Sequence, residues 1–378
     1  MNAPSHNPWL HRFAVLTAAA TFLLLGVGGL VTSKGAGMAV PDWPTSYGYN
    51  MFALPFKFWQ GGVLYEHSHR LVASGVGLLT TILVVWLWVK EPRRWVKWLG
   101  VIAFFAVVLQ GVLGGLRVVW LKDEIGIFHA TLAQLFFVLT CALALFTSRW
   151  WRTLPSPLPP LLSDGRGEQQ SFSLGNLPGF VLATTLLILC QLILGATMRH
   201  QHAGLAIPDF PLAYGKLWPA MDADSVARYN QQRVEIVAAN PITAFQISLQ
   251  MAHRLMAVGI LIGVGAVVWG ARRWSPRFSV SDGGDSLKAG LQRLAFVWFG
   301  LILAQVALGA WTIWSNKAAD VATAHVLVGA LSLVTGALWC IISFRRPVTQ
   351  FGCKSVSTSA RDLRETVFKA RAAGSVSK

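Results

Sequence analysis

The stretch Tyr-Glu-His-Ser-His-Arg-Leu occupies residues 65–71 and opens a long apolar run that continues to Val89. An apolar run of this length predicts a helix that spans a membrane. Ionisable side chains are costly so close to hydrocarbon, and they therefore mark functional sites in membrane helices. Glu66 and His69 lie three positions apart, so the predicted helix presents them on one face. This stretch thus predicts a membrane span and a functional site where that span begins.

The same pattern returns in the second half of the chain. Residues 250–255 read Gln-Met-Ala-His-Arg-Leu and again open an apolar run. His253 takes the place of His69, while Gln250 stands where the first copy has Glu66. This exchange keeps the shape of the side chain and removes its charge. We therefore expect the two copies to share a binding function and to differ in chemistry.

The composition indicates a protein that crosses a membrane many times. Of the 378 residues, 54% are hydrophobic and 13% are charged, which is too apolar for an ordinary soluble domain. Eight apolar runs reach the length of about 20 residues that a spanning helix needs. We therefore predict an all-α polytopic membrane protein with eight transmembrane helices. The predicted spans are 12–32, 67–89, 98–119, 125–147, 177–198, 244–270, 291–314 and 321–344.

The net charge of +16 follows the predicted topology rather than a nucleic-acid site. With the N-terminus in the cytoplasm, the inner segments carry 21 Lys and Arg residues and the outer segments carry 9. This bias places both termini in the cytoplasm and adds attraction to anionic lipid. The first apolar run is too long for a cleaved signal, and no basic amphipathic presequence precedes it. We expect a multi-pass protein of the bacterial plasma membrane, with lipid and no nucleic acid as partners.

Four pairs of matching segments, in the same order in both halves, show that the chain contains an internal repeat. Residues 36–44 return as 203–211, a shift of 167, and His69 returns as His253, a shift of 184. Residues 110–114 return as 305–309, a shift of 195, and His129 returns as His325, a shift of 196. Each half has an even number of spans, so both halves have the same orientation.

The repeat predicts two tandem, pseudo-symmetric four-helix bundles. A Pro-rich and then Gly- and Ser-rich segment separates them, and it predicts an irregular cytoplasmic linker. The predicted units are the N-terminal bundle (1–148), the linker (149–176), the C-terminal bundle (177–346) and a basic cytoplasmic tail (347–378).

The histidines at positions 69, 129, 253 and 325 form the candidate site. Each is the repeat partner of another, and each lies in the outer part of an even-numbered predicted span, so the members of each pair lie at similar depth. Two histidines that face each other across a four-helix bundle suit axial ligation of heme iron. Zinc or copper would need further nitrogen, sulfur or carboxylate ligands. Arg70 and Arg254 follow two of the ligands and could meet heme propionates or reach the headgroups.

The outer segments 33–65 and 199–243 are rich in aromatic residues, Pro and Gly. Such residues can form an interfacial belt, and here they are also numerous enough to form a lid over each bundle. Asp42 and Asp209 each follow a proline, which predicts helix caps or Asx turns rather than catalysis. His67 lies two positions from His69 and therefore faces elsewhere.

These motifs together resemble the heme A synthase family. The resemblance rests on Glu66-x-x-His69-Arg70, Gly126-x-x-His129, the Pro-Asp-aromatic-Pro outer segments, His253-Arg254 and His325, and it spans roughly residues 12–344. Members of that family are eight-helix membrane enzymes that oxidise the C8 methyl of heme O to a formyl group, giving heme A for cytochrome oxidase. Some bacterial members carry a cysteine pair in the first outer segment, and residues 33–65 contain no cysteine.

The resemblance implies that one bundle binds the substrate heme and the other a heme b cofactor, and that Glu66 matches the essential carboxylate of the family. The Gln250 half lacks that carboxylate, so we assign His69 and His129 to the substrate heme. His253 and His325 are then assigned to heme b. Heme O synthase and cytochrome oxidase assembly factors are the expected protein partners, and self-association of the chain is left open.

Two other functions use the same histidines. A diheme electron carrier needs four ligands, but it has no need for a carboxylate in one half only or for large aromatic outer segments. A transporter with parallel repeats needs a polar path to both membrane faces, whereas the polar residues of the predicted spans gather near the outer face. We therefore expect an oxidoreductase that hydroxylates the heme methyl stepwise to a geminal diol, which loses water to give the aldehyde.

Overall fold

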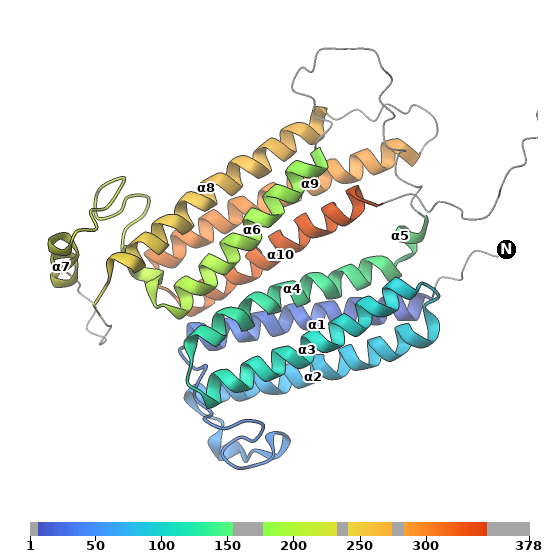
Figure 1. The fold of residues 1–378 in the computed structure, drawn as a ribbon, viewed down its shortest axis with the longest axis horizontal. Coiled ribbons are helices and arrows are strands. Elements are labelled where there is room, and N and C mark those ends of the chain that lie inside the picture. The colour runs from blue at the N-terminus through green and yellow to red at the C-terminus, as the bar shows by residue number, and fades with distance from the viewer. Residues whose placement is uncertain (1–6, 154–176, 233–240, 274–282, 346–378) are drawn as a thin grey trace, which may run out of the picture. The chain divides into compact units, whose positions relative to one another are not determined.

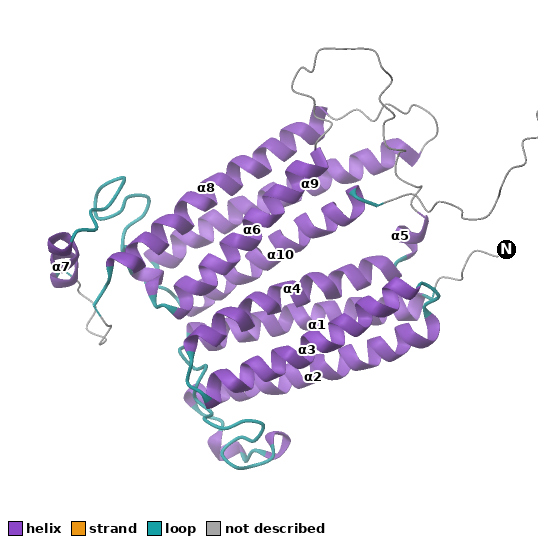
Figure 2. Ribbon diagram, in the orientation of Figure 1, coloured by secondary structure: helices purple, strands orange, loops and turns teal. Residues whose placement is uncertain are grey.

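The computed structural model describes residues 7–153, 177–232, 241–273 and 283–345. Within these ranges eight helices are long and apolar enough to cross a membrane, which confirms the predicted number, and no named strand is present (Figures 1 and 2). Several helices begin earlier than the predicted spans because their polar first turns are helical too. The eight helices are α1 (Pro8–Ser33), α2 (Gly61–Lys90), α3 (Arg94–Val119), α4 (Asp123–Thr147), α6 (Leu177–His200), α8 (Ala244–Arg273), α9 (Gly283–Trp314) and α10 (Ala319–Ser343).

Backbone hydrogen bonding explains why these segments are helical. Backbone N–H and C=O groups find no water in hydrocarbon, and an α-helix satisfies them within one segment. Polar residues then mark the helix ends. Asn7 caps α1, because its Oδ1 accepts hydrogen bonds from the backbone N–H groups of Trp9 and Leu10 at 3.1 and 3.2 Å. Pro8 follows at the first helical position, where its missing N–H costs nothing.

The spanning helices form two groups of four, which is compatible with the predicted pair of bundles. In the first group α1 and α3 each pack against α2 and α4, and in the second α6 and α9 each pack against α8 and α10 (Figure 1). Each group has its own apolar core, with Leu83 and Leu143 fully buried in the first and Val264 and Trp298 in the second. The exact limits of the two units stay a prediction, and the tail 347–378 lies outside the described residues.

The two bundles touch through α1, α4, α6 and α10. α1 packs against α10, and α4 packs against both α6 and α10. Leu25, Phe137, Ala330 and Val334 are buried in this contact. Exchanging the two halves turns the α1–α10 contact into the α6–α4 contact, so the interface follows the repeat. The contact also places α4, which carries His129, beside α10.

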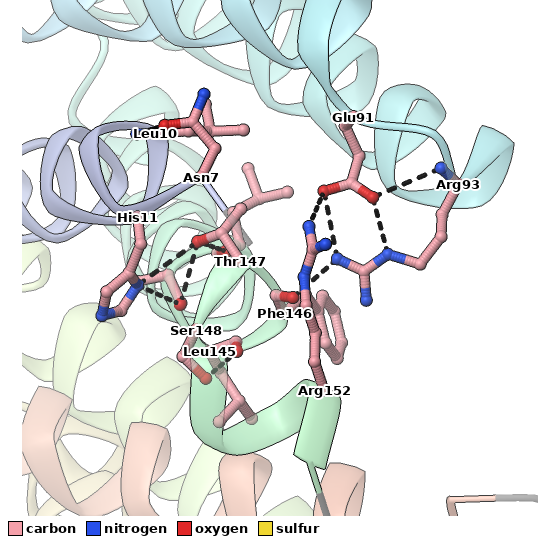
Figure 3. A network of polar contacts seen from close by, with 12 residues as sticks. Asn7, Leu10, His11, Glu91, Arg93, Leu145, Phe146, Thr147, Ser148 and Arg152 are labelled. Carbon is pink, nitrogen blue, oxygen red and sulfur yellow. Dashed lines mark hydrogen bonds and ion pairs between the residues drawn. The ribbon is translucent and has the colours of Figure 1, made fainter. Parts of the chain in front are cut away.

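The first residues of the linker form a helix, α5 (Arg149–Thr153), where we expected irregular chain. Buried Trp151 and an ion pair explain the difference (Figure 3). Glu91 is fully buried at the end of α2 and pairs with Arg93 at 2.7 Å and with Arg152 at 2.8 Å. Burial raises the pKa of Glu91, but the hydrogen bonds and charge of Arg93 and the charge of Arg152 outweigh it, so the pKa lies below 4.5. The remainder of the linker, 154–176, lies outside the described residues.

The two outer segments share one backbone motif. The Asp42 carboxylate accepts hydrogen bonds from the N–H groups of Tyr47 and Gly48 at 2.7 and 2.9 Å and from the Thr45 hydroxyl at 2.5 Å. Asp209 makes the same two backbone bonds at 2.7 and 2.8 Å, which confirms the predicted turn role of both aspartates. Burial raises the pKa of Asp42, but these hydrogen bonds lower it below 3.8. The repeat therefore extends to the fine structure of the outer segments.

The second outer segment also contains a short helix that the sequence did not predict, α7 (Ala223–Gln231). Asp222 caps it, since the Asp222 side chain accepts a hydrogen bond from the N–H of Ser225 at 2.9 Å. The Tyr214 and Tyr229 rings stack with centroids 3.6 Å apart and join α7 to the shared turn. α7 lies in the part of the chain where the repeat shift rises from 167 to 184 and contributes nine residues to that rise.

Candidate functional site

Four histidines occupy equivalent places in the two bundles, at the positions that the sequence predicted. His69 lies on α2 and His129 on α4, while His253 lies on α8 and His325 on α10. Each ring keeps some accessible surface, but its Nδ1 atom is buried and has no hydrogen-bond partner. A buried polar atom without a partner needs an explanation such as a bound group or water. All four histidines share this property.

The first pair of equivalent rings, His69 and His253, lies against glycines of the helices that open each bundle. A Cβ atom added at Gly28 on α1 would lie 3.0 Å from Cε1 of His69. A Cβ added at Gly195 on α6 would lie 3.4 Å from Cε1 of His253. Gly28 and Gly195 differ by the repeat shift of 167. A larger residue at Gly28 would therefore require the His69 ring to shift, whereas a Cβ at Gly195 would make ordinary van der Waals contact with His253.

The second pair, His129 and His325, repeats this arrangement on α3 and α9. A Cβ added at Gly114 would lie 3.4 Å from Cε1 of His129, and one added at Gly309 would lie 3.2 Å from Cε1 of His325. These two glycines belong to the repeated segments 110–114 and 305–309. The glycines therefore let four imidazoles approach the neighbouring helix backbones at four matched places.

The geometry of the C-terminal pair fits two axial ligands of one metal. The ring centroids of His253 and His325 lie 6.4 Å apart with an angle of 55° between the planes. A metal–imidazole nitrogen bond is about 2 Å long, which places the centroids of two opposed ligand rings about 6 Å apart. Within the described ranges no three His, Cys, Asp or Glu side chains gather in a way that could hold a bare metal ion. Two nitrogen ligands per bundle suit heme iron.

Glutamine side chains support the backbone of the ligand-bearing helices. Gln110 donates a hydrogen bond to the carbonyl oxygen of His129 at 3.0 Å, and Gln191 donates one to the carbonyl of His253 at 2.9 Å. Gln305, the repeat partner of Gln110, instead lies 3.5 Å from Nε2 of His325. The repeat had identified Gln110 and Gln305, whereas nothing in the sequence pointed to Gln191.

Glu66 and Gln250 hold the outer segments in the same way. Glu66 is 4% exposed, and its Oε2 accepts a hydrogen bond from the Val40 N–H at 2.8 Å. In the C-terminal half Oε1 of Gln250 accepts one from the Ile207 N–H at 2.7 Å. Each residue makes a further contact: Oε1 of Glu66 pairs with Arg70 at 2.8 Å, while Nε2 of Gln250 donates to the Ile207 carbonyl at 3.2 Å. We call the shared bond, from the outer-segment N–H to the side-chain oxygen, the latch. This bond needs only an acceptor oxygen, so the charge of Glu66 is additional to it.

The two arginines that follow the ligands bind backbone carbonyls of the outer segments. Arg70 donates to the carbonyls of Val40, Asp42 and Thr45 at 2.7 to 3.0 Å. Arg254 donates to the carbonyls of Asp209 and Leu212 at 2.7 and 2.8 Å, while its Nε stays buried without a partner. The described contacts thus fasten both segments, and contact of either arginine with a propionate stays a prediction.

His67 has a separate place in the fold. Its ring packs edge-on against Trp59 with centroids 4.8 Å apart, and its Nδ1 lies 3.4 Å from the Ser46 hydroxyl. Both partners belong to the first outer segment. His67 therefore attaches that segment to α2, as expected of a histidine that faces away from His69.

The structure also reveals a charged cluster that sequence reasoning missed. Arg117 pairs with Asp123 at 3.1 Å, and the buried His200 ring lies 3.8 Å from the same carboxylate. Arg199 donates to the Gly29 carbonyl and to the Ser33 hydroxyl on α1. The charge count places Arg117 and Arg199 in the outer segments, but both lie on spanning helices. The repeat held the signal, since Thr312 and Thr32 occupy their equivalent positions.

Comparison with known proteins gives one family over most of the chain. The family model described as cytochrome oxidase assembly protein matches residues 11–337. The heme A synthase of Geobacillus thermodenitrificans is 28% identical over 365 residues, which cover 92% of this chain and 96% of the relative. The heme A synthase of Geobacillus kaustophilus is 28% identical over 84% of this chain and 87% of the relative. That of Lysinibacillus sphaericus is 27% identical over 70% and 76%.

Proposed function

This chain belongs to the cytochrome oxidase assembly protein family, and we propose that it oxidises the C8 methyl group of heme O to the formyl group of heme A. A role in heme A synthesis follows from the family and from heme A synthases that align over as much as 92% of the chain. The chain is thus an oxidoreductase, and its eight spanning helices and bacterial relatives make it a multi-pass protein of the bacterial plasma membrane. The observation that carries the proposal is the two pairs of histidines whose buried Nδ1 atoms have no hydrogen-bond partner.

The two bundles take different hemes in this proposal. His69 and His129 bind the substrate heme O in the N-terminal bundle, and His253 and His325 bind a resident heme b in the C-terminal bundle. The 6.4 Å ring separation of the second pair supports ligation there. The assignment of the halves rests on Glu66, because the equivalent Gln250 makes the same latch without a charge. A resident heme supplies a redox-active iron within the membrane.

The reaction is a stepwise oxidation of one methyl carbon. Two successive hydroxylations turn the methyl group into an alcohol and then a geminal diol; each adds one oxygen atom from dioxygen or water and removes two electrons, which an external oxidant takes up. Loss of water from the diol leaves the aldehyde. Positive charge on the methyl carbon during its oxidation is stabilised by a nearby fixed anion. Glu66 lies one helical turn from the ligand His69, and the Val40 N–H and Arg70 hold its carboxylate in place. Its role is therefore electrostatic, with the loop latch as its support.

Protein partners follow from the substrate and the product. Heme O is too apolar to travel freely in water, so the enzyme that makes it, heme O synthase, is the expected donor. Heme A is destined for cytochrome oxidase, so assembly factors of that enzyme are the expected acceptors. Both transfers are open to the membrane, because the two bundles carry their sites within spanning helices.

The test is pigment analysis of cells that make heme O, with and without this chain. Hemes are extracted from the membranes and separated by chromatography. We expect heme A only where the chain is present, and we expect a His129→Ala variant to accumulate heme O instead. A chain that binds heme b in the membrane but yields no heme A would contradict the proposal and favour a diheme electron carrier.

A further inference from the structure

The charged cluster lies at only one of two equivalent contacts between the bundles. At the contact of α6 with α4, His200 packs so closely against α4 that a Cβ at Gly126 would overlap its ring. At the equivalent contact of α1 with α10, the Ser33 hydroxyl lies 3.3 Å from the Thr323 hydroxyl. The residues of α1 and α10 in the second contact carry no charge of their own, although the Ser33 hydroxyl also accepts a hydrogen bond from Arg199 of α6. The two halves share one fold, so the fold does not explain why charged residues occur at one contact and not at the other.

Each charged residue of the cluster has a neutral repeat partner. The shift of 167 pairs Arg199 with Thr32, and the shift of 195 pairs Arg117 with Thr312. The shift of 196 pairs Asp123 with an alanine, Ala319. Thr32 and Thr312 donate hydrogen bonds to carbonyls of their own helices at 3.1 and 2.8 Å, so these positions can be filled without a charge. A charge within a membrane span is costly and is kept for a function.

The cluster contains more positive than negative charge. Arg117 has one carboxylate partner, Asp123, and its buried Nε has no partner. Arg199 binds the neutral oxygens of Gly29 and Ser33, and no carboxylate pairs with it in the part of the chain that the structure describes. Of the two guanidinium groups, Arg117 is paired with a carboxylate and Arg199, among the described residues, is not. A buried cation that lacks a counter-charge favours binding of an anion.

The position of the cluster indicates which anion it binds. Arg117 lies on α3 three positions after Gly114, the glycine that packs against His129. Arg199 binds the carbonyl of Gly29, the residue after the glycine that packs against His69. Both arginines are therefore anchored within one helical turn of a glycine that packs against a histidine of the N-terminal pair.

We propose that Arg117 and Arg199 form a binding site for a carboxylate of the porphyrin held by His69 and His129. This inference rests on the proposed function. Guanidinium groups bind carboxylates through paired charge-assisted hydrogen bonds, which fix orientation as well as position. The C8 methyl group neighbours a propionate on the porphyrin rim, so a fixed carboxylate also fixes the methyl group to be oxidised. The C-terminal bundle thereby supplies one residue of the N-terminal site.

The experiment compares two porphyrins that differ only in their carboxylates. The full-length protein with its resident heme is titrated with iron protoporphyrin IX and with its dimethyl ester, and binding is followed by absorbance. One charge-assisted hydrogen bond corresponds to roughly a 10- to 100-fold preference for the diacid. We expect this preference in the parent and its loss in Arg117→Thr and in Arg199→Thr, which carry the residues of the neutral contact. Arg228→Gln on α7 removes a positive charge elsewhere and should keep the preference.

Two results would overturn the site. One is equal binding of diacid and diester by the parent, and the other is an unchanged preference in both threonine variants. The absorbance of the resident heme reports folding of each variant. If Arg199→Thr loses that heme, the porphyrin preference of Arg117→Thr alone tests the site. Heme A formation is measured separately. If the parent prefers the diacid but makes no heme A, the carboxylate site stands and the proposed function is wrong. If the parent makes heme A but shows no preference, the proposed function stands and the carboxylate site is wrong.

Discussion

Replacing Glu66 with glutamine gives the N-terminal half the residue that the C-terminal half already carries. The amide oxygen of the new side chain can accept the Val40 N–H bond, as the Gln250 oxygen accepts the Ile207 N–H bond at 2.7 Å. What disappears is the charge and its pairing with Arg70 at 2.8 Å. The substitution Glu66→Gln therefore separates the latch from the charge.

The expected cost to stability is small. Loss of one charge-assisted hydrogen bond costs about 1.5–3 kcal/mol, and the low end applies because Arg70 keeps three carbonyl acceptors. Glu66→Ala removes the latch as well and leaves both Val40 N–H and Arg70 short of a partner, at about 3–5 kcal/mol. Glu66→Gln should thus fold and bind both hemes, whereas Glu66→Ala should loosen the first outer segment.

The expected cost to activity is large. Removal of one preorganised group that stabilises transition-state charge lowers the rate by about 10²–10³-fold. We expect Glu66→Gln to abolish or strongly reduce heme A, with heme O and the alcohol intermediate accumulating. The converse change, Gln250→Glu, is the matched control. It should leave heme A formation at the parent level and create no second active site, because the resident heme b stays bound and is not the farnesylated substrate heme O.

The assay extracts hemes from cells that carry each variant and separates them by chromatography, with the heme b spectrum as a measure of folding. If Glu66→Gln makes heme A at the parent rate, the electrostatic role is refuted, and Glu66 serves only to hold the first outer segment. Equal losses in Glu66→Gln and Glu66→Ala with intact spectra would be compatible with a role of charge. A loss in Glu66→Ala alone would assign the effect to the outer segment.

Three further predictions concern the histidine ligands, the glycines that pack against them and the ion pairs of Glu91. Alanine in place of His253 or His325 should remove the heme b absorbance, and an unchanged heme content in both variants would contradict the ligand assignment. Gly28→Ala should weaken heme binding in the N-terminal half more than Gly195→Ala does in the C-terminal half, because the added Cβ would lie 3.0 Å rather than 3.4 Å from the ring; equilibrium titration measures this difference. Glu91→Gln should lower the free energy of unfolding by about 3–5 kcal/mol at neutral pH, because Arg93 and Arg152 lose their carboxylate partner. Since the folded-state pKa of Glu91 lies below 4.5, its stabilisation is present above pH 4.5 and is lost as the pH falls through the lower folded value, so thermal unfolding of parent and variant should converge in acid.

The sequence predicted those features that depend on length, periodicity or repetition. The eight spans follow from apolar length, and the four histidines follow from their equivalent positions in two copies. The turns at Asp42 and Asp209 follow from local side-chain chemistry. These signals are local or repeated, so a single chain displays them without tertiary information.

Contacts between distant segments could not be predicted in this way. The latch joins Glu66 to a backbone N–H 26 residues earlier, and that N–H is positioned only by the folded turn. Arg199 reaches Gly29 across 170 residues, and in the sequence it reads as one more charge at the end of a span. The α5 helix depends on the Glu91–Arg152 ion pair, whose partners are 61 residues apart. Each of these features depends on the docking of helices rather than on their formation.

Comparison of the two halves distinguishes residues that both proposed heme pockets share from residues that occur in only one of them. Both halves keep the glycine-backed histidines and the acceptor oxygen that holds an outer segment, so these features serve binding. The charges of Glu66, Arg117 and Arg199 replace neutral partners in the other copy. Because each charge is costly in a membrane, its presence around one pocket supports the proposal that chemistry takes place in that pocket. In the proposed carboxylate site Arg199 comes from the other bundle, so we expect the N-terminal bundle alone to form an incomplete site.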